Sequence, residues 1–344
     1  MTAMPAVPVS VVVPAYNAAR FIDEALASVH AQTRRPAEII VVDDGSTDDT
    51  AARARANGAV VVSQRNQGLS GARNTGIRHA SQPWVALLDA DDLWEPRKLE
   101  LQWAAATLCP DAGVVFTDVT RFSAHGIVDP SIFGRTKHYR AVRRTELGEG
   151  IVRCERDSLQ QAFVKENFFS PSAAMIRRDV LLAVGLFDTT VTHREDRDMW
   201  LRLLAVTDVA VVELPLMRYR VHGSGLSNDD RGMARSAVAI AHKVLANPSQ
   251  YFPYAVDRYR ADLPGLYLIA GRLEEQSGNI SLARSYYVSS WKAGRGIRPL
   301  ALAVLSTMPK PLRGAARHVV NNVAAFRGWL MRALTAPDHR ERRA

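Results

Sequence analysis

Short apolar runs alternate with amphipathic stretches over the first 120 residues of the chain. The apolar runs are rich in β-branched residues and end at polar or turn-forming positions, which is typical of buried strands. They cover residues 10–13, 38–42, 59–62, 84–88 and 113–116. Between the first two runs, apolar residues recur at helical spacing from Phe21 to Val29 and predict an amphipathic helix. This alternation predicts an α/β fold whose mainly parallel sheet is flanked by helices.

The chain becomes less regular after residue 120. Residues 121–165 are polar and basic and show no clear strand or helix pattern, and we expect them to include a mobile loop. Periodicity then predicts strands over 172–176 and 208–212, and helices over 180–184 and 198–206.

Helical periodicity dominates the last third of the chain. Residues 263–292 predict a helical hairpin that turns at Gly278 and Asn279. It resembles one tetratricopeptide-type unit, but no second copy follows at the required period, which favours a single helix pair packed on the main body. We therefore expect a first domain over residues 1–230 and a helical C-terminal region over 231–344.

The net charge of +9 is concentrated near the C-terminus. Residues 295–344 contain ten Lys or Arg and two acidic residues, so the first 294 residues carry a net charge of only +1. A main body so close to neutral gives no support for a nucleic-acid partner. The basic stretch 312–334 predicts an amphipathic helix that either lies on an anionic membrane surface or packs against the preceding helices. Residues 336–344 are predicted to be disordered.

The bulk properties of the chain also indicate a location. No apolar run reaches 18 residues, and the N-terminus lacks the pattern of a secretory signal. The two cysteines, Cys109 and Cys154, are too few for a disulfide framework or a zinc site. We therefore expect a cytoplasmic protein, with peripheral attachment to the inner face of the plasma membrane if the basic helix binds lipid.

Three carboxylates, Asp89, Asp91 and Asp92, directly follow the strand predicted over residues 84–88. Carboxylates crowded at a strand end repel one another, and a divalent cation such as Mg²⁺ or Mn²⁺ is a common reason for keeping them together. The alternative is a solvated acidic turn that caps the next helix.

Other polar residues are expected at the same edge of the sheet. Tyr16 follows the first predicted strand, and Asp43 and Asp44 follow the second. Ligands of open α/β sheets bind beyond the carboxyl ends of the strands. We therefore expect these side chains and the acidic run to converge on one cleft.

Motifs in three parts of the chain form one pattern. The motifs are Val11–Asn17 with Val41–Asp48, then Asn66–Gly76 with Asp89–Asp92, and finally Glu195–Leu203 with Tyr219–His222. In this order and spacing they resemble the family 2 glycosyltransferases, which have the GT-A nucleotide-diphospho-sugar transferase fold, over about residues 7–227. The resemblance implies an inverting, hexosyltransferase-type enzyme with a nucleotide-sugar donor.

The resemblance assigns roles on the donor side. Asp91 is expected to touch the metal directly, and Asp89 to bind the ribose or a metal-bound water. Asp44 is expected to accept a hydrogen bond from the nucleobase, which suits the imide N–H of uracil or thymine. The residues expected to wall the base are Pro14, Ala15 and Tyr16.

Several of these residues keep two interpretations. Tyr16 faces the base or is simply packed, and Asp43 contributes to the site or only orients its turn. Arg73 contacts a phosphate or the aspartate cluster, or else forms a structural ion pair. Asp92 belongs to the metal site or caps a helix. His222 reaches the metal or the diphosphate, or is a structural histidine.

The acceptor side centres on Glu195 and Asp196. An acceptor hydroxyl becomes an effective nucleophile when a positioned carboxylate takes its proton. The resemblance gives this role to Asp196, with Glu195 supporting it or binding the acceptor, and plain N-capping by Asp196 is the alternative. Asp198 and Trp200 fit helix capping and acceptor-side packing.

The implied reaction is a single displacement at the anomeric carbon. Asp196 deprotonates the acceptor hydroxyl, and Mn²⁺ or Mg²⁺ held by Asp91 offsets the charge of the departing diphosphate. The expected donor is a UDP-sugar, ahead of dTDP- or GDP-sugars, and the expected acceptor is a surface glycan or a lipid-linked sugar.

Two other classes of protein stay as alternatives. A nucleotidyltransferase also uses paired aspartates and a metal, but Pro14–Asn17 is not the Gly-rich, basic loop that such enzymes carry after the first strand. A non-catalytic scaffold on a transferase fold is disfavoured by the intact Asp91 and Asp196. The chain has no dinucleotide-binding fingerprint and no Walker loop, which argues against dinucleotide oxidoreduction and P-loop ATP hydrolysis.

Overall fold

The computed structural model describes residues 5–223, 228–294 and 297–306 of the chain. The predicted basic helix over 312–334 and the predicted disordered end over 336–344 lie outside the described residues. Contacts divide the chain into two compact units. The first comprises Met1–Asn228 and His242–Arg258, and the second comprises Asp229–Ala241 and Tyr259–Ala344. A domain boundary at residue 230 stays a prediction.

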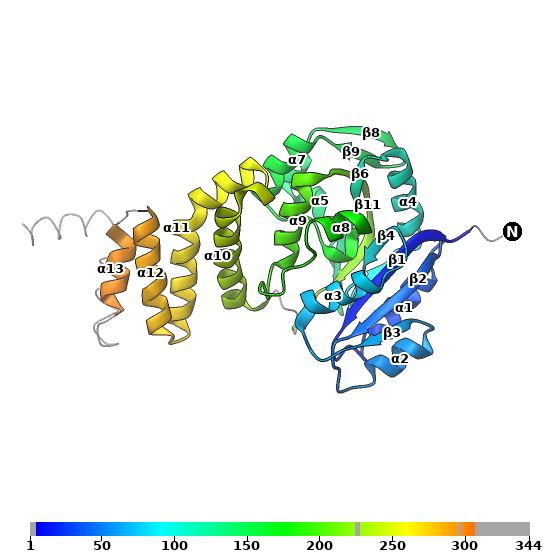
Figure 1. Ribbon diagram of the computed structural model, residues 1–344, viewed down its shortest axis with the longest axis horizontal. Helices are drawn as coiled ribbons and strands as arrows, with labels where there is room; N and C mark the ends of the chain where they lie inside the picture. The colour runs from blue at the N-terminus through cyan, green and yellow to red at the C-terminus, as the bar shows by residue number, and fades with distance from the viewer. Residues whose placement is uncertain (1–4, 224–227, 295–296, 307–344) are drawn as a thin grey trace, which may run out of the picture. The chain divides into compact units, whose positions relative to one another are not determined.

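In the described part of the chain, eleven strands form one mixed sheet in the first unit (Figure 1). Its main path has the order β3-β2-β1-β4-β10-β6-β11-β9-β8, while β5 pairs with β11 and β7 pairs with β6. The strands are β1 (Val7–Ala15), β2 (Pro36–Asp43), β3 (Val60–Ser63), β4 (Trp84–Leu87), β5 (Leu93–Trp94), β6 (Ala112–Ser123), β7 (Gly126–Asp129), β8 (Arg144–Gly148), β9 (Ile151–Cys154), β10 (Ala174–Arg177) and β11 (Asp208–Arg220).

The direction of the strands decides where the site lies. Parallel pairing joins β1 to β2 and β4, β2 to β3, and β6 to β11. β10 runs antiparallel between β4 and β6, so β6 and β11 point the same way as β1. The carboxyl ends of β1, β2, β4, β6 and β11 therefore lie along one edge, which we call the carboxyl edge.

Helices join and cover these strands. Those in the first unit are α1 (Ile22–His30), α2 (Thr50–Ala56), α3 (Gly68–His79), α4 (Lys98–Leu108), α5 (Ile132–Arg135), α6 (Lys137–Arg140), α7 (Arg156–Phe163), α8 (Arg178–Ala183) and α9 (Glu195–Val206), with 3₁₀ turns η1 (Pro171–Ala173) and η3 (Pro248–Gln250). α3 packs on β1 and β2, and α4 packs on β6 and β11 (Figure 1).

Both faces of β1 are covered. Val11 shares a buried cluster with Ile22 of α1, so the predicted amphipathic helix is confirmed. Val12 points to the opposite face. There α3 approaches so closely that a Cβ on Gly76 would stand 2.3 Å from Cγ1 of Val12. Only a glycine fits at position 76, and its small size lets α3 pack directly on the sheet.

The segment 121–165 is more regular than the sequence predicts, because β7, α5, α6, β8, β9 and α7 occupy most of it. Buried aromatic rings supply its core. Phe133 stacks on Tyr139 with ring centroids 3.9 Å apart, and Phe163 stacks on Phe169 at 5.7 Å. These aromatic residues do not recur at the spacing of a strand or a helix. Because most of the residues around them are polar or basic, the sequence pattern does not reveal this core. The sequence pattern therefore misses these elements, and a mobile loop within 121–165 stays a prediction.

The second unit is helical in its described part. Its helices are α10 (Asp230–Ala246) and α11 (Pro253–Gln276), which each begin or end in the first unit, with α12 (Ile280–Gly294) and α13 (Ile297–Leu305). The predicted hairpin is confirmed, because α11 and α12 join at Gly278, whose φ is +85°. It is not an isolated pair, since Leu302 of α13 packs with Tyr287 of α12. No helix within the described residues is both long and apolar enough to cross a membrane.

Candidate active site

Polar residues from three parallel strands meet at the carboxyl edge. Tyr16 follows β1, Asp44 follows β2, and the acidic run 89–92 begins two residues after β4. The backbone N–H of Asp44 donates to the carbonyl of Ala15, and that of Leu88 donates to the carbonyl of Val12. These residues therefore lie at one edge of the sheet, and their convergence on one cleft stays a prediction.

The residues expected near a nucleobase differ in exposure. The Tyr16 ring is 53% exposed, so it is not simply packed, whereas Pro14 and Ala15 are buried. Asp44 is also buried, and its Oδ1 accepts hydrogen bonds from Gln64 Nε2 (2.7 Å) and from the backbone N–H of Gln67 (2.8 Å). Among Pro14, Ala15 and Tyr16, only the tyrosine presents an open side chain.

Two loops at this edge are tied together. Oδ1 of Asn17 accepts from the backbone N–H of Thr47, and the N–H of Asn17 donates to Ser46 Oγ, both at 2.9 Å. Oδ1 of Asp43 accepts from the N–H of Ser46 at 3.1 Å. Asp43 therefore orients its own turn, which is one of its two predicted roles.

Arg73 of α3 bridges two distant acidic residues. Its guanidinium is buried, and Nη2 donates to Asp89 at 2.7 and 3.0 Å while Nη1 donates to Glu195 at 2.6 Å. Burial raises the pKa of Asp89 and of Glu195, and the positive charge of Arg73 opposes that rise. The fork of Arg73 thus holds the loop after β4 next to the start of α9.

This bridge bears on the role predicted for Asp89. Both oxygens of Asp89 accept from Arg73, and its backbone N–H donates to Ser172 Oγ at 2.9 Å. Arg73 therefore contacts the aspartate cluster and forms an ion pair at the same time. Binding of ribose or of a metal-bound water by Asp89 stays a prediction.

Asp91 and His222 form a second, more open pair. Nε2 of His222 lies 2.8 Å from Oδ2 of Asp91, and their side chains are 23% and 35% exposed. Phe21 lies beside the imidazole, with ring centroids 5.3 Å apart. No cluster of three or more metal-ligating side chains occurs in the described part of the chain. A carboxylate and an imidazole nonetheless fit Mn²⁺ or Mg²⁺ when substrate phosphates and water complete the shell.

Asp92 neither caps a helix nor faces the open pair. It is fully buried, where Oδ2 accepts from Ser172 Oγ (2.6 Å) and Oδ1 accepts from the backbone N–H of Arg220 (3.0 Å). Burial and the neighbouring carboxylates raise the pKa of Asp92 well above its ordinary value. The predicted helix-capping role is therefore wrong, because the side chain points inward and joins the 3₁₀ turn η1 to the end of β11. A part in the metal site stays a prediction. Nε of Arg220 also donates to the carbonyl of Asp91 at 2.8 Å.

Asp196 lies in the first turn of α9 and is partly exposed. The N-cap residue of α9 is Arg194, in a left-handed conformation with φ +59°, and its own side chain makes no capping hydrogen bond. Oδ1 of Asp196 accepts from the backbone N–H of Arg197 at 2.7 Å, so the carboxylate contributes to the cap of α9, and its role as a base stays a prediction. Its Oδ2 accepts from Asn167 Nδ2 at 3.1 Å. Asn167 is a neighbour that no local sequence signal indicates.

Asp198, expected at a helix cap, is instead a buried hub. It accepts from Arg202 Nη2 (2.7 Å), Lys243 Nζ (2.9 Å) and Tyr251 Oη (2.8 Å). The predicted capping role is wrong because the side chain faces residues 242–258 rather than the end of α9. Trp200 is buried as well, edge-on to a core phenylalanine.

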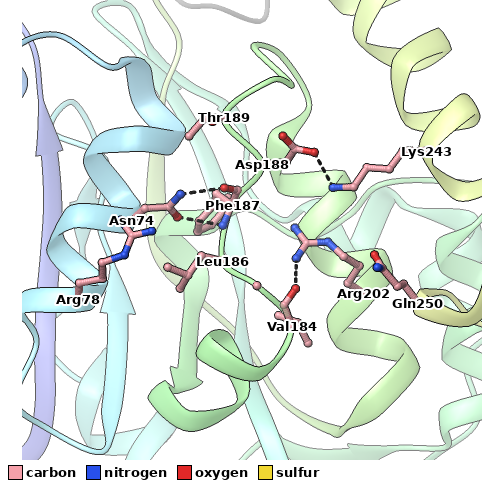
Figure 2. A pocket seen from close by; sticks show the side chains of 11 residues that line it. Asn74, Arg78, Val184, Leu186, Phe187, Asp188, Thr189, Arg202, Lys243 and Gln250 are labelled. Atoms are coloured by element: carbon pink, nitrogen blue, oxygen red, sulfur yellow. Dashed lines mark hydrogen bonds and ion pairs between the residues drawn. The ribbon is translucent and has the colours of Figure 1, made fainter. Parts of the chain in front are cut away.

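A polar pocket of about 430 Å³ lies between α3, α9 and the loop before α9 (Figure 2). Figure 2 shows the Asn74 amide paired with the backbone of Phe187, which donates at 2.9 Å and accepts at 2.8 Å. It also shows Asp188 paired with Lys243 at 2.7 Å. None of the predicted site residues lines this pocket, but the Phe187 ring in its wall lies 5.2 Å from the guanidinium carbon of Arg73.

The sequence profile of the family described as "Glycosyl transferase family 2" matches residues 10–185. The chain belongs to glycosyltransferase family 2. The family predicted from the motifs at the carboxyl edge is thereby confirmed.

Curated relatives of this family 2 chain include proteins from several bacteria. It is 26% identical over 295 residues to an uncharacterized glycosyltransferase of Rickettsia felis, covering 81% of this chain and 44% of that protein. It is 34% identical over 215 residues to succinoglycan biosynthesis protein ExoU of Rhizobium meliloti, covering 60% and 59%. It is 37% identical over 98 residues to UDP-Glc:alpha-D-GlcNAc-diphosphoundecaprenol beta-1,3-glucosyltransferase WfgD of Escherichia coli, covering 27% and 39%. The chain spans about half the length of these curated relatives.

Solved structures with the same fold include S. aureus TarS 1-349 in complex with UDP-GlcNAc, with a TM-score of 0.59 and 19% identity over 93% of this chain and 89% of that one. Another is the mannosyltransferase PcManGT from Pyrobaculum calidifontis in complex with GDP-Man and Mn²⁺, with a TM-score of 0.53 and 20% identity over 98% and 91%. These likenesses confirm the GT-A fold and the helical C-terminal region.

Proposed function

We propose that this chain is an inverting glycosyltransferase that moves a sugar from a nucleotide-sugar donor to a hydroxyl of a glycan or lipid-linked acceptor. One observation carries the proposal: Arg73 joins Asp89 to Glu195, so the acidic loop after β4 and the start of α9 meet at the carboxyl edge. A transferase needs its donor-binding and base-bearing elements at that distance, because both reactants must occupy one site.

The donor side is proposed to take a UDP-sugar. The open ring of Tyr16 offers a flat apolar face to a base, and Asp44 offers a fixed carboxylate that accepts an imide N–H. The complexes of TarS with UDP-GlcNAc and of PcManGT with GDP-Man support a nucleotide-sugar donor. GDP- and dTDP-sugars are the next candidates.

Asp91 and His222 are proposed to hold Mn²⁺ or Mg²⁺, with Asp89 close by. When bound, the ion would offset the negative charge that grows on the leaving diphosphate. The Mn²⁺ of PcManGT supports a divalent ion in this fold. Arg220 contributes by fixing the backbone carbonyl of Asp91, and Asp92 contributes by fixing Arg220. Both contacts restrain where the Asp91 carboxylate points.

Asp196 is proposed to act as the general base. It is the partly exposed acid of α9, whereas Glu195 is buried against Arg73. Asp196 would take the proton of the acceptor hydroxyl, whose oxygen attacks the anomeric carbon as the bond to the diphosphate breaks. One displacement inverts that carbon and leaves no covalent enzyme intermediate.

The acceptor is proposed to be a polysaccharide intermediate or a lipid-linked sugar. The names of ExoU and WfgD support these two classes. The basic stretch 312–334, outside the described residues, is proposed as a peripheral membrane contact.

The proposal is tested with a panel of nucleotide sugars and Mn²⁺ or Mg²⁺. Release of a nucleoside diphosphate is expected, whereas a nucleotidyltransferase would form or consume pyrophosphate. Asp196→Asn is expected to leave donor affinity nearly unchanged and to lower transfer by about 10²–10⁴-fold, the range of general-base catalysis. Asp23→Asn, at an exposed ion pair with Arg53, is the matched control.

Two outcomes would decide against the proposal. Transfer that survives Asp196→Asn removes the base assignment. A protein that turns over none of the nucleotide sugars favours the scaffold alternative.

A further inference from the structure

The β6–β7 hairpin stands at the carboxyl edge, beside the candidate active site. Phe122 of β6 pairs with Arg220 of β11, and the backbone N–H of Val221 donates to the carbonyl of Phe122 at 2.8 Å. The next residue is His222, which meets Asp91. Phe122 of the hairpin is therefore paired with a residue two positions before His222, a proposed metal ligand that follows the end of β11.

The tip of this hairpin, residues 124–128, is exposed along its whole length. It includes two neighbouring aliphatic residues, Ile127 and Val128, which are 68% and 53% exposed. Among the described strands β7 pairs only with β6, so it is an edge strand. Edge strands are usually protected by charge or proline, which makes adjacent exposed aliphatic side chains an exception. Such a tip favours a partner that takes up apolar groups.

The chain around the hairpin tip carries surplus positive charge. Residues 119–142, all of them described, contain the hairpin, α5 and α6 and hold four Lys or Arg but one acidic residue. That residue, Asp129, is buried and pairs with Arg135 at 2.7 Å. The guanidinium of Arg218 on β11 lies over the ring of Phe122, 4.6 Å from its centroid, and also pairs with Glu95 at 3.9 Å. The tip is thus apolar, and its surroundings attract anions.

We propose that the hairpin tip docks into the headgroup region of an anionic lipid bilayer. That region accepts aliphatic side chains and attracts nearby Lys and Arg, so it matches both properties of this surface. Docking would bring the carboxyl edge to the membrane, where a lipid-linked acceptor is presented. The inference rests on the proposed function for the identity of the acceptor, but docking is measured without any sugar transfer.

A polarity-sensitive fluorophore on Ile127→Cys in the full chain tests the docking directly. Cys109 and Cys154 are buried, so the new thiol is the one that is labelled. Vesicles of phosphatidylcholine mixed with phosphatidylglycerol are expected to shift the emission to the blue, and salt to reduce the shift. Phosphatidylcholine alone gives a smaller shift. The matched control is a label on Val60→Cys, an aliphatic residue of β3 that is 58% exposed, and its emission stays unchanged.

A double variant, Ile127→Ser with Val128→Ser, measures the contribution of the tip. Binding to the mixed vesicles is expected to weaken at least roughly tenfold, because two aliphatic side chains lose their transfer into lipid. Unchanged hydrolysis of the donor shows that the variant is folded.

Two results overturn the docking proposal: no binding to the mixed vesicles, or binding that leaves the label at position 127 unshifted. The second result would mean that another part of the chain binds lipid. A blue shift of the label emission in a protein that shows no glycosyltransferase activity would support the docking proposal and reject the proposed function.

Discussion

Two acidic groups at the carboxyl edge differ in how the protein compensates them. Asp89 and Glu195 share the buried guanidinium of Arg73, whereas Asp91 pairs with the imidazole of His222 and stays partly exposed. The charge of the first group is partly compensated within the fold, and its ion pairs join two segments of the chain. The second keeps oxygen atoms accessible to a ligand. Asp89 and Asp91 are two residues apart in the sequence, but their partners give them different roles. Asp89 takes part in a structural ion pair, and Asp91 is left available to bind a ligand.

The largest effect is expected from a substitution of Arg73. Arg73→Leu leaves two carboxylates without their cation in a largely buried place, and we expect the free energy of unfolding to fall by about 3–5 kcal/mol. Urea unfolding measures this loss. Arg53→Leu removes an arginine from an exposed pair with Asp23 and is the matched control, with an expected loss of about 1 kcal/mol or less. Equal stability of the Arg73 variant and the wild type would show that the ion pairs of Arg73 do not stabilise the fold.

Asp91→Asn should lower sugar transfer and leave stability nearly unchanged, which is the opposite of the effect expected for Arg73→Leu. We expect transfer at fixed metal concentration to fall by about 100-fold, close to 3 kcal/mol in the activation free energy, because a metal-held carboxylate is lost. Unfolding in urea without metal should change little, since Asp91 is partly exposed. Titration with Mn²⁺ should show weaker activation. A variant that loses stability but keeps its metal response would reverse the roles of the two groups.

Lys98 extends the comparison, because this buried lysine forms no ion pair with a carboxylate among the described residues. Its Nζ donates to Gln102 Oε1 at 2.8 Å and lies over the Trp94 ring, and burial lowers the pKa of Lys98 well below its usual value. Between that lowered pKa and about 10.4, the unfolded chain binds more protons than the folded one, so stability rises with pH. Lys98→Met should remove this dependence.

At neutral pH we expect Lys98→Met to be more stable than the wild type by about 1–3 kcal/mol, the cost of burying a polar group without full compensation. The difference should shrink as the pH approaches 10. Urea unfolding at several pH values measures it, with Lys165→Met at an exposed position as the control. A difference that is constant with pH would mean that Lys98 does not titrate in this range.

Much of the fold follows from local pattern. The apolar runs predict β1, β2, β3, β4 and β6, and the motifs at their ends predict the family, because these signals repeat over a few residues. The segment 121–165 escapes prediction because its core consists of scattered aromatic rings such as Phe133 and Tyr139. Ser172 escapes for a related reason: it opens a predicted strand, and only the folded chain sets its hydroxyl between Asp89 and Asp92.

The sequence by itself determined the order of the strands and helices in the first 120 residues, the acidic run after β4, and its place at the carboxyl edge. Only the tertiary structure decided which carboxylates are buried, which share Arg73, and which stays open beside His222. The spacing of apolar and polar residues reports on single helices and strands. Arg73 and Glu195, in contrast, are 122 residues apart, and Asp91 and His222 are 131 residues apart. Such pairs depend on where the folded sheet brings its loops together, and no local sequence pattern contains that information.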